Sequence, residues 1–170
     1  MKYLIAISFI MLMASSCLDF VIPEDLTLPK RPYTGDELRI DGYYYYDYLP
    51  VDSEEYVHTY FLYENGIILD GGITDEDEFT TQEWIDHVKK YRHRWGLFNI
   101  DGDNIVFERW MPRSPAQPVV FIHQGKILND TTFHISSMSR LDGSDKREVD
   151  RTYHFKQFSP KPNSTNKYIK

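Results

Sequence analysis

Two short turn signals constrain the fold of this chain more than any other feature. Asn65-Gly66 separates two runs rich in strand-forming residues, 55–63 and 67–69, and Asp101-Gly102-Asp103 separates a similar pair further along. A tight hairpin turn of this kind needs positive φ angles at its central residues, which Asn, Asp and Gly adopt readily. Each signal therefore predicts two neighbouring antiparallel strands.

Between residues 35 and 158, the rest of the chain also alternates strand-forming runs with turn-forming residues. Aromatic residues make up 15% of the sequence, and they favour strands because their side chains pack well on a pleated sheet. The sequence predicts a mainly β domain, an antiparallel up-and-down β-barrel or half-barrel of about eight strands. Besides the two hairpins, we expect strands at 38–48, 118–123, 126–128, 131–138 and 151–158, with a turn at Gln124-Gly125 and a polar loop at 140–149.

One segment has helical rather than strand periodicity. Thr80 and Glu83 fit a capping box, in which each side chain bonds to the other residue's free backbone N–H. Apolar residues then recur every three or four positions until Gly96, which is expected to end the helix. We therefore predict one inserted α-helix over 81–94, whose apolar stripe packs on the sheet: Trp84, Val88, Tyr91 and Trp95.

The chain begins with a segment typical of an export signal. Lys2 precedes the apolar run 4–13, which is about half of the ~20 residues that a helix needs to cross a bilayer. Small residues then lead to Cys17, the only cysteine in the chain. A single unpaired thiol is unusual in an exported protein, and a lipid on that sulfur would account for it.

This stretch, from Lys2 through Ser15-Ser16-Cys17, resembles the signal peptide of bacterial lipoproteins. The resemblance implies that residues 1–16 are removed by cleavage between Ser16 and Cys17, and that Cys17 is lipidated and anchors the protein in a membrane. Because Leu18 rather than Asp follows the cysteine, the resemblance favours the outer membrane, with the protein facing the periplasm or the cell surface.

Proline marks both ends of the expected body. Residues 17–34 contain three prolines and are expected to form an extended tether from the lipidated cysteine. Residues 159–170 contain two prolines and a polar Asn-Ser-Thr-Asn run, and are expected to form a mostly disordered tail. The β domain is expected to span 35–158.

The body resembles the small lipocalin-like, calycin-type β-barrel domains of uncharacterised Bacteroidetes lipoproteins. The resemblance covers about 38–158 and implies a barrel of the same kind. The residues that carry it are Gly42-Tyr43-Tyr44-Tyr45, the hairpin from Trp95-Gly96-Leu97-Phe98 to Ile105-Val106-Phe107-Glu108, and Asn129-Asp130-Thr131-Thr132-Phe133.

Aromatic side chains are the candidates for a ligand site. The run from Tyr43 to Tyr46 alternates in a strand, so two of its rings fill the interior and two lie outside. Such rings either form a platform for sugars or flat apolar ligands, or pack in the core and across strands. The candidate ligand-binding residues are Tyr43, Tyr45, Tyr60 and Trp95.

The six histidines have no metal-site spacing. If strands 131–138 and 151–158 pair around residue 144, His134 faces His154 on the outside and Phe133 faces Phe155 inside. An outward pair of histidines can hold a metal or respond to pH, although exposed sheet histidines commonly do neither. We therefore predict no metal site and no cofactor.

Other motifs carry weaker signals. The acidic run 70–78 lacks the residue order of a calcium loop, so it is predicted to be a solvated loop leading into the helix. Asp130-Thr131-Thr132 resembles the short motif at which Bacteroidetes attach O-glycans to exported proteins, which makes Thr131 a candidate for glycosylation. No familiar catalytic motif is present in the sequence, and no catalytic residue is singled out.

Charge and composition leave two main functions open. The net charge of −7 argues against nucleic acid as a partner. A non-catalytic, lipid-anchored barrel would serve as an interaction module for an envelope protein partner, or bind a small apolar or sugar-like ligand in its mouth. The alternative is an envelope enzyme that uses carboxylates or histidines there. A ligand carrier needs unfilled interior volume, whereas the many large apolar residues favour a filled interior.

Overall fold

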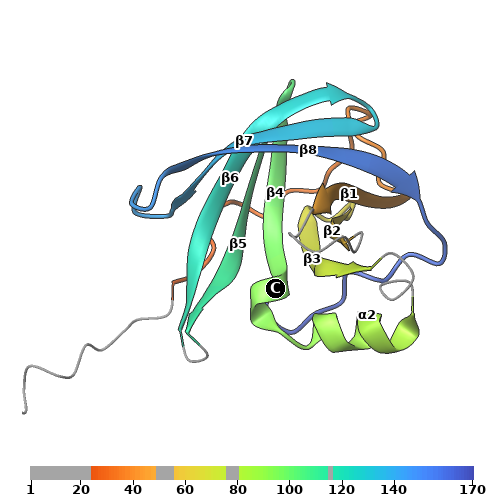
Figure 1. The fold of residues 1–170 in the computed structure, drawn as a ribbon, viewed down its shortest axis with the longest axis horizontal. Coiled ribbons are helices and arrows are strands. Elements are labelled where there is room, and N and C mark those ends of the chain that lie inside the picture. The colour runs from red at the N-terminus through yellow and green to blue at the C-terminus, as the bar shows by residue number, and fades with distance from the viewer. Residues whose placement is uncertain (1–23, 49–55, 76–80, 115–116) are drawn as a thin grey trace, which may run out of the picture.

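The computed structural model describes residues 24–48, 56–75, 81–114 and 117–170. Each of its eight strands pairs antiparallel with the next in sequence, and the last pairs with the first, so the barrel is closed (Figure 1). The predicted mainly β class and up-and-down order are confirmed. The elements are β1 (Gly42–Tyr48), β2 (Tyr56–Leu62), β3 (Ile67–Asp75), α2 (Gln82–Lys89), the 3-10 helix η1 (Arg92–Arg94), β4 (Trp95–Asp101), β5 (Asn104–Ser114), β6 (Gln117–Asn129), β7 (Thr132–Arg140) and β8 (Arg147–Gln157).

Both hairpin signals are confirmed. Gly66 joins β2 to β3 and Gly102 joins β4 to β5, and both have positive φ, at 77° and 59°. Gly66 also has a second reason to lack a side chain. A Cβ there would lie 2.2 Å from the backbone oxygen of Arg31, which crosses the turn. The two turns fix the order of four of the eight strands.

The turn expected at Gln124-Gly125 is wrong. These residues lie inside β6, where the register with β7 shifts at a β-bulge. A Cβ on Gly125 would lie 2.0 Å from the backbone oxygen of His134. Glycine is needed here because β7 approaches closely, and the chain does not reverse.

The helix is shorter than predicted. Thr81 is the N-cap, and its side chain accepts a hydrogen bond from the Trp84 backbone N–H at 3.2 Å. Thr80, the expected cap, lies outside the described residues. The helix ends at Lys89, and Trp95 instead begins β4, where its indole Nε1 donates to the backbone oxygen of Lys89 at 3.1 Å. The expected end point is wrong because burial of this indole against the sheet turns the chain through η1.

The interior of the barrel is packed with aromatic rings. Tyr60 of β2 lies 5.2 Å, centroid to centroid, from Phe107 of β5 and 5.1 Å from Tyr153 of β8. These strands are not neighbours, so the rings meet across the interior. The inner cluster draws on seven strands and the segment before β1: Leu38, Tyr44, Tyr60, Leu62, Ile68, Phe98, Ile105, Phe107, Phe133, Ile135 and Tyr153.

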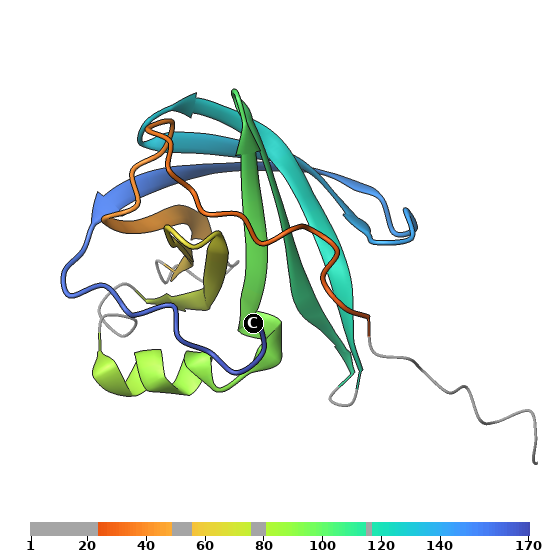
Figure 2. The same ribbon diagram turned by 180° about the vertical axis from the view of Figure 1, so that it is seen from behind.

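Residues 24–41 cross β4 and β5 on the outside of the barrel (Figure 2), and near the end of this segment Leu38 joins the inner cluster. We call residues 24–41 the strap. The buried Glu108 carboxylate of β5 accepts hydrogen bonds from the backbone N–H of Thr27 at 2.6 Å and of Leu28 at 2.9 Å. Leu26 and Leu28 pack against an outer apolar cluster that includes Trp110. Burial of these groups holds the strap on the wall.

The C-terminal residues also lie on the outer wall, next to α2 (Figure 2). We expected 159–170 to be mostly disordered. In the structure, the Lys161 ammonium donates to the backbone oxygens of Ile40 and Leu62, and the Tyr168 hydroxyl donates to that of Lys90. Tyr168 and Ile169 pack against the outer apolar cluster. The difference arises because these side chains cover apolar surface of the first strands and α2.

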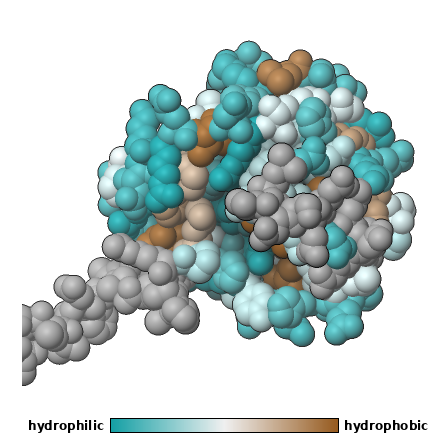
Figure 3. Space-filling view, in the orientation of Figure 1, coloured by the Kyte–Doolittle hydropathy of each residue, from teal (hydrophilic) through white to brown (hydrophobic). Residues whose placement is uncertain are grey.

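The barrel is uneven in length. β3 and β4 pair only from Ile67–Leu97 to Leu69–Trp95, whereas β5 and β6 pair along most of their length. The sheet of β5 to β8 therefore extends beyond the closed ring (Figure 1). Figure 3 shows a hollow on this face with apolar atoms along its floor. Within the described residues, no helix has the length and apolar character needed to cross a membrane.

Candidate ligand site inside the barrel

A buried carboxylate organises the polar part of the interior. Asp70 points inward from β3 with only 3% of its surface exposed, and one of its oxygens pairs with the Arg109 guanidinium of β5. Its other oxygen accepts the backbone N–H of Gly72 at 2.6 Å and lies 3.2 Å from Nε2 of His58. Although burial opposes ionisation, Arg109 and His58 hold the pKa of Asp70 well below its usual range. The residue is therefore an anion.

His58 continues this network to β8. Burial lowers the pKa of His58, against the opposing effect of Asp70, so the ring is neutral at pH 7. Because Nε2 faces the carboxylate, it carries the proton and donates to Asp70. Nδ1 is then the acceptor, and the Tyr153 hydroxyl donates to it across 3.2 Å. A continuous chain of polar contacts thus crosses the barrel from Tyr153 to Arg109.

The series of polar contacts from Tyr153 to Arg109 is not arranged to activate a nucleophile. Burial raises the pKa of the Tyr153 hydroxyl well above its usual value, so it stays protonated. Asp70 is already neutralised by Arg109, and His58 uses both ring nitrogens within the network. General acid–base catalysis needs a group whose pKa lies near the working pH.

His123 has two buried polar atoms without a partner among the described residues, and the Tyr60 hydroxyl and Arg94 Nε are also unpartnered. It lies on β6 with 2% of its surface exposed, and its ring stacks on Phe107 at 4.6 Å and 11°. Burial lowers its pKa well below the usual value, so the ring is neutral and offers one donor and one acceptor. Among the described residues, neither ring nitrogen has a hydrogen-bond partner, and neither does Nε of Arg109. Leaving such a group unpaired costs about 1–3 kcal/mol.

The same region carries an excess of positive charge. Arg94 of η1 reaches Asp70 at 3.6 Å, and the Arg151 guanidinium of β8 lies 5.4 Å from the ring centroid of Tyr46. Arg109 and Arg151 both act electrostatically on His123. Among the buried residues that the structure describes, Asp70 supplies the only inward-facing carboxylate. We call this group the polar layer: His58, Asp70, Arg94, Arg109, His123, Arg151 and Tyr153.

An apolar group adjoins the polar layer on the extended part of the sheet. Met111, Phe121 and Val149 each lie two positions along a strand from Arg109, His123 and Arg151, so each shares their inward face. All three are nearer the end where β5 turns into β6 and β7 into β8. We call this cluster the apolar layer: Met111, Val119, Phe121, Met138 and Val149.

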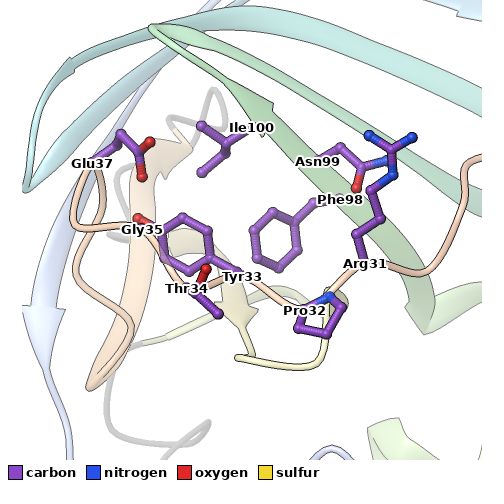
Figure 4. Close-up of a pocket in the computed structure, with 9 residues that line it drawn as sticks. All are labelled: Arg31, Pro32, Tyr33, Thr34, Gly35, Glu37, Phe98, Asn99 and Ile100. Carbon is purple, nitrogen blue, oxygen red and sulfur yellow. The ribbon is translucent and has the colours of Figure 1, made fainter.

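A separate pocket of about 250 Å³ lies where the strap crosses β4 (Figure 4). The rings of Tyr33 and Phe98 pack at 5.8 Å along it. In Figure 4 the Glu37 carboxylate and the Arg31 guanidinium lie at opposite sides of these rings. Arg31, Thr34, Glu37 and Asn99 bring polar groups to its lining, but the two charged ones lie apart rather than converging on one position.

The four predicted ligand-binding residues are not brought together. Tyr60 points into the barrel beside Arg109, whose guanidinium lies 5.7 Å from its ring centroid. Tyr43, Tyr45 and Trp95 belong to the outer cluster, because the inward pair of the tyrosine run is Tyr44 and Tyr46. Their role in ligand binding stays a prediction.

The predicted histidine pairing is wrong. His154 lies opposite Thr132 and His134 lies opposite Thr152, so the register differs by two residues. The turn between β7 and β8 lies closer to β7 than expected, which shifts the pairing next to it by three residues, and the bulge between Ile135 and Ser137 takes back one of them. His134 instead contacts the Asp150 carboxylate at 2.9 Å. The described part of the chain contains no group of three or more residues suited to bind a metal ion.

The acidic run 70–78 and the candidate glycosylation residue Thr131 can be compared with the structure in part. The acidic run 70–78 was expected to be solvated, which is wrong for Asp70, since it is buried in β3. Residues 76–78 lie outside the described residues. Thr131 lies half-buried in the turn between β6 and β7, where its hydroxyl donates to the Asn129 side chain at 2.8 Å. Glycosylation of Thr131 stays a prediction.

Sequence reasoning missed the polar layer, although a signal was present. On each strand a polar residue stands two positions from large apolar ones that share its face, as Arg109 does after Phe107 and Asp70 after Ile68. Strand alternation alone would therefore have placed these charges inside.

The fold and site define a closed eight-stranded antiparallel β-barrel with a buried polar layer. No protein-family model matches the chain, and comparison with curated proteins and with solved structures found no match.

Proposed function

We propose that this chain is a lipid-anchored envelope protein whose barrel binds a small molecule without transforming it. One observation carries the proposal. His123 is buried in the barrel, and within the described residues both of its ring nitrogens lack a partner, as does Nε of Arg109 beside the same layer. A polar guest molecule in the barrel would supply the missing partners, which supports a ligand site beside His123.

The surroundings of His123 support the same function. Polar groups set the orientation of a small ligand, and apolar surface beside them supplies most of the contact area. Here the polar layer adjoins the apolar layer on one inner face.

A protein-docking function has less support. An interaction module would need a contiguous exposed apolar patch. The large apolar residues exposed in the described part of the chain lie on separate elements: Tyr48, Ile73, Tyr91 and Leu128. Their scattered positions favour the interior as the binding site.

The envelope location is proposed from the leader sequence. The apolar run 4–13 and the single Cys17 support export and lipidation. A lipid on Cys17 would place the barrel at a membrane surface, in the outer membrane and facing the periplasm or the cell surface.

Native mass spectrometry of the protein purified gently from its host tests the ligand proposal. We expect a bound mass of a few hundred daltons, and we expect His123→Phe to lose it. His154→Phe is the matched control, because His154 is exposed on the outer face. A wild-type mass equal to that of the lipidated chain alone, with nothing bound, would contradict the proposal.

A further inference from the structure

The ligand's chemistry follows from the charges that face the apolar layer. We propose that the barrel binds an organic anion, with its acidic group in the polar layer and its apolar part against the apolar layer. This inference rests on the proposed function and names the class of molecule that the site accepts.

The charge balance of the polar layer argues for an anion. Asp70 compensates one guanidinium, that of Arg109, and also lies 3.6 Å from Arg94. Arg151 takes part in no ion pair with the described residues, and its guanidinium lies 5.4 Å from the ring centroid of Tyr46. A cation that is half-buried without a counter-charge attracts an acidic group. A carboxylate beside Arg151 would restore the balance.

Hydrogen-bonding capacity argues for the same group. Arg109 Nε and one ring nitrogen of His123 are unpaired donors within the described residues. A carboxylate offers two acceptor oxygens, and hydrogen bonds from guanidinium to carboxylate are about twice as strong as neutral ones. A neutral sugar or alcohol would satisfy the donors but leave the charge uncompensated.

The apolar layer determines the size of the ligand's apolar part. Phe121 lies directly opposite Arg109 across the β5–β6 pair, and Val119 lies opposite Met111 one level further out. From Arg109 to the end of β5 at Ser114 the strand rises about 16 Å, at ~3.3 Å per residue. An unbranched chain of about eight carbons fits within that length.

Octanoate and octanol form a matched pair of probes, because they differ mainly in the acidic group. The chain from Leu18 onward keeps every described residue and retains two of the five methionines, Met111 and Met138, both in the apolar layer. Labelling the methionine methyl groups with ¹³C lets NMR report binding at this layer directly. We expect octanoate to shift both methyl signals, with at least about tenfold higher affinity than octanol.

Arg151→Gln supplies the decisive variant. We expect it to weaken octanoate binding by about tenfold or more and to leave octanol binding unchanged. Lys126→Gln is the control, because it removes the same charge from an exposed residue near the β4–β5 turn, where Lys126 pairs with Asp103.

The outcomes separate the two proposals. Equal affinities for octanoate and octanol, or equal effects of the two variants, would overturn the anion inference and leave small-molecule binding standing. Failure of both probes to bind the folded protein would also overturn it. The proposed function would then be decided by the native mass measurement alone.

Discussion

Mild acid should destabilise this protein, because two histidines are buried in their neutral form. Burial lowers the pKa of both His58 and His123 in the folded state, whereas an unfolded histidine titrates near ~6.5. As pH falls through this value, the two histidines bind protons in the unfolded chain but stay unprotonated in the folded chain. The stabilisation is therefore complete above pH ~6.5 and is lost progressively below it.

The magnitude follows from linkage. One proton taken up only by the unfolded state changes the free energy of unfolding by about 1.4 kcal/mol per pH unit. Two histidines give up to about 2.7 kcal/mol per unit, a large fraction of the ~5–15 kcal/mol typical of a domain. Asp70 acts in a separate range. Its pKa is lowered in the folded state, so its contribution is lost only below its unfolded pKa of ~3.9.

Urea unfolding followed by tryptophan fluorescence at pH 7.5 and 5.5 measures this effect. We expect the free energy of unfolding to fall by about 2 kcal/mol between the two conditions. His123→Phe should remove about half of the dependence, and the exposed control His154→Phe should leave it unchanged. Equal stabilities of the wild-type protein at both pH values would refute the assignment of neutral buried rings.

Four further outcomes are expected. Trp95→Ala should lower the free energy of unfolding by about 3–5 kcal/mol in urea melts, because the indole is completely buried. Asp70→Asn should cost a similar ~3–5 kcal/mol in the same assay, since it leaves Arg109 as an uncompensated buried charge. Glu108→Ala should expose the strap to limited proteolysis, and an unchanged cleavage pattern would contradict the contacts described. Cys17→Ala should release the protein from the membrane fraction, and retention at high salt would exclude the lipid anchor.

The local parts of the fold were predictable because their causes are local. Asn65-Gly66 and Asp101-Gly102 specify turns through their own backbone preferences, and the strands they join alternate as expected. Gly125 shows the limit of this reasoning. Its small size serves the approach of a strand that is adjacent only in space, so a local reading gave a turn that does not exist.

The site was less accessible to sequence reasoning. Alternation places Arg109 and Asp70 on inward faces, but their pairing depends on how β2 to β5 close into a barrel. The exposed histidine pair failed for the same reason, since the position of the β7–β8 turn and the bulge between Ile135 and Ser137 together leave the register two residues from the expected one. Long-range register is set by many contacts together and is not encoded in any one segment.

The docked strap limits how far the barrel can stand from an anchor. Glu24 is fixed to the outer wall, where its side chain accepts the Val120 backbone N–H at 2.7 Å and its backbone oxygen accepts Trp110 Nε1 at 2.8 Å. Both partners lie on the half of β5 and β6 nearest their shared hairpin. Seven residues of extended chain from Cys17 reach at most about 25 Å. With a lipid on Cys17, the hairpin end of β5 and β6 would therefore stay within a few tens of ångströms of the bilayer surface.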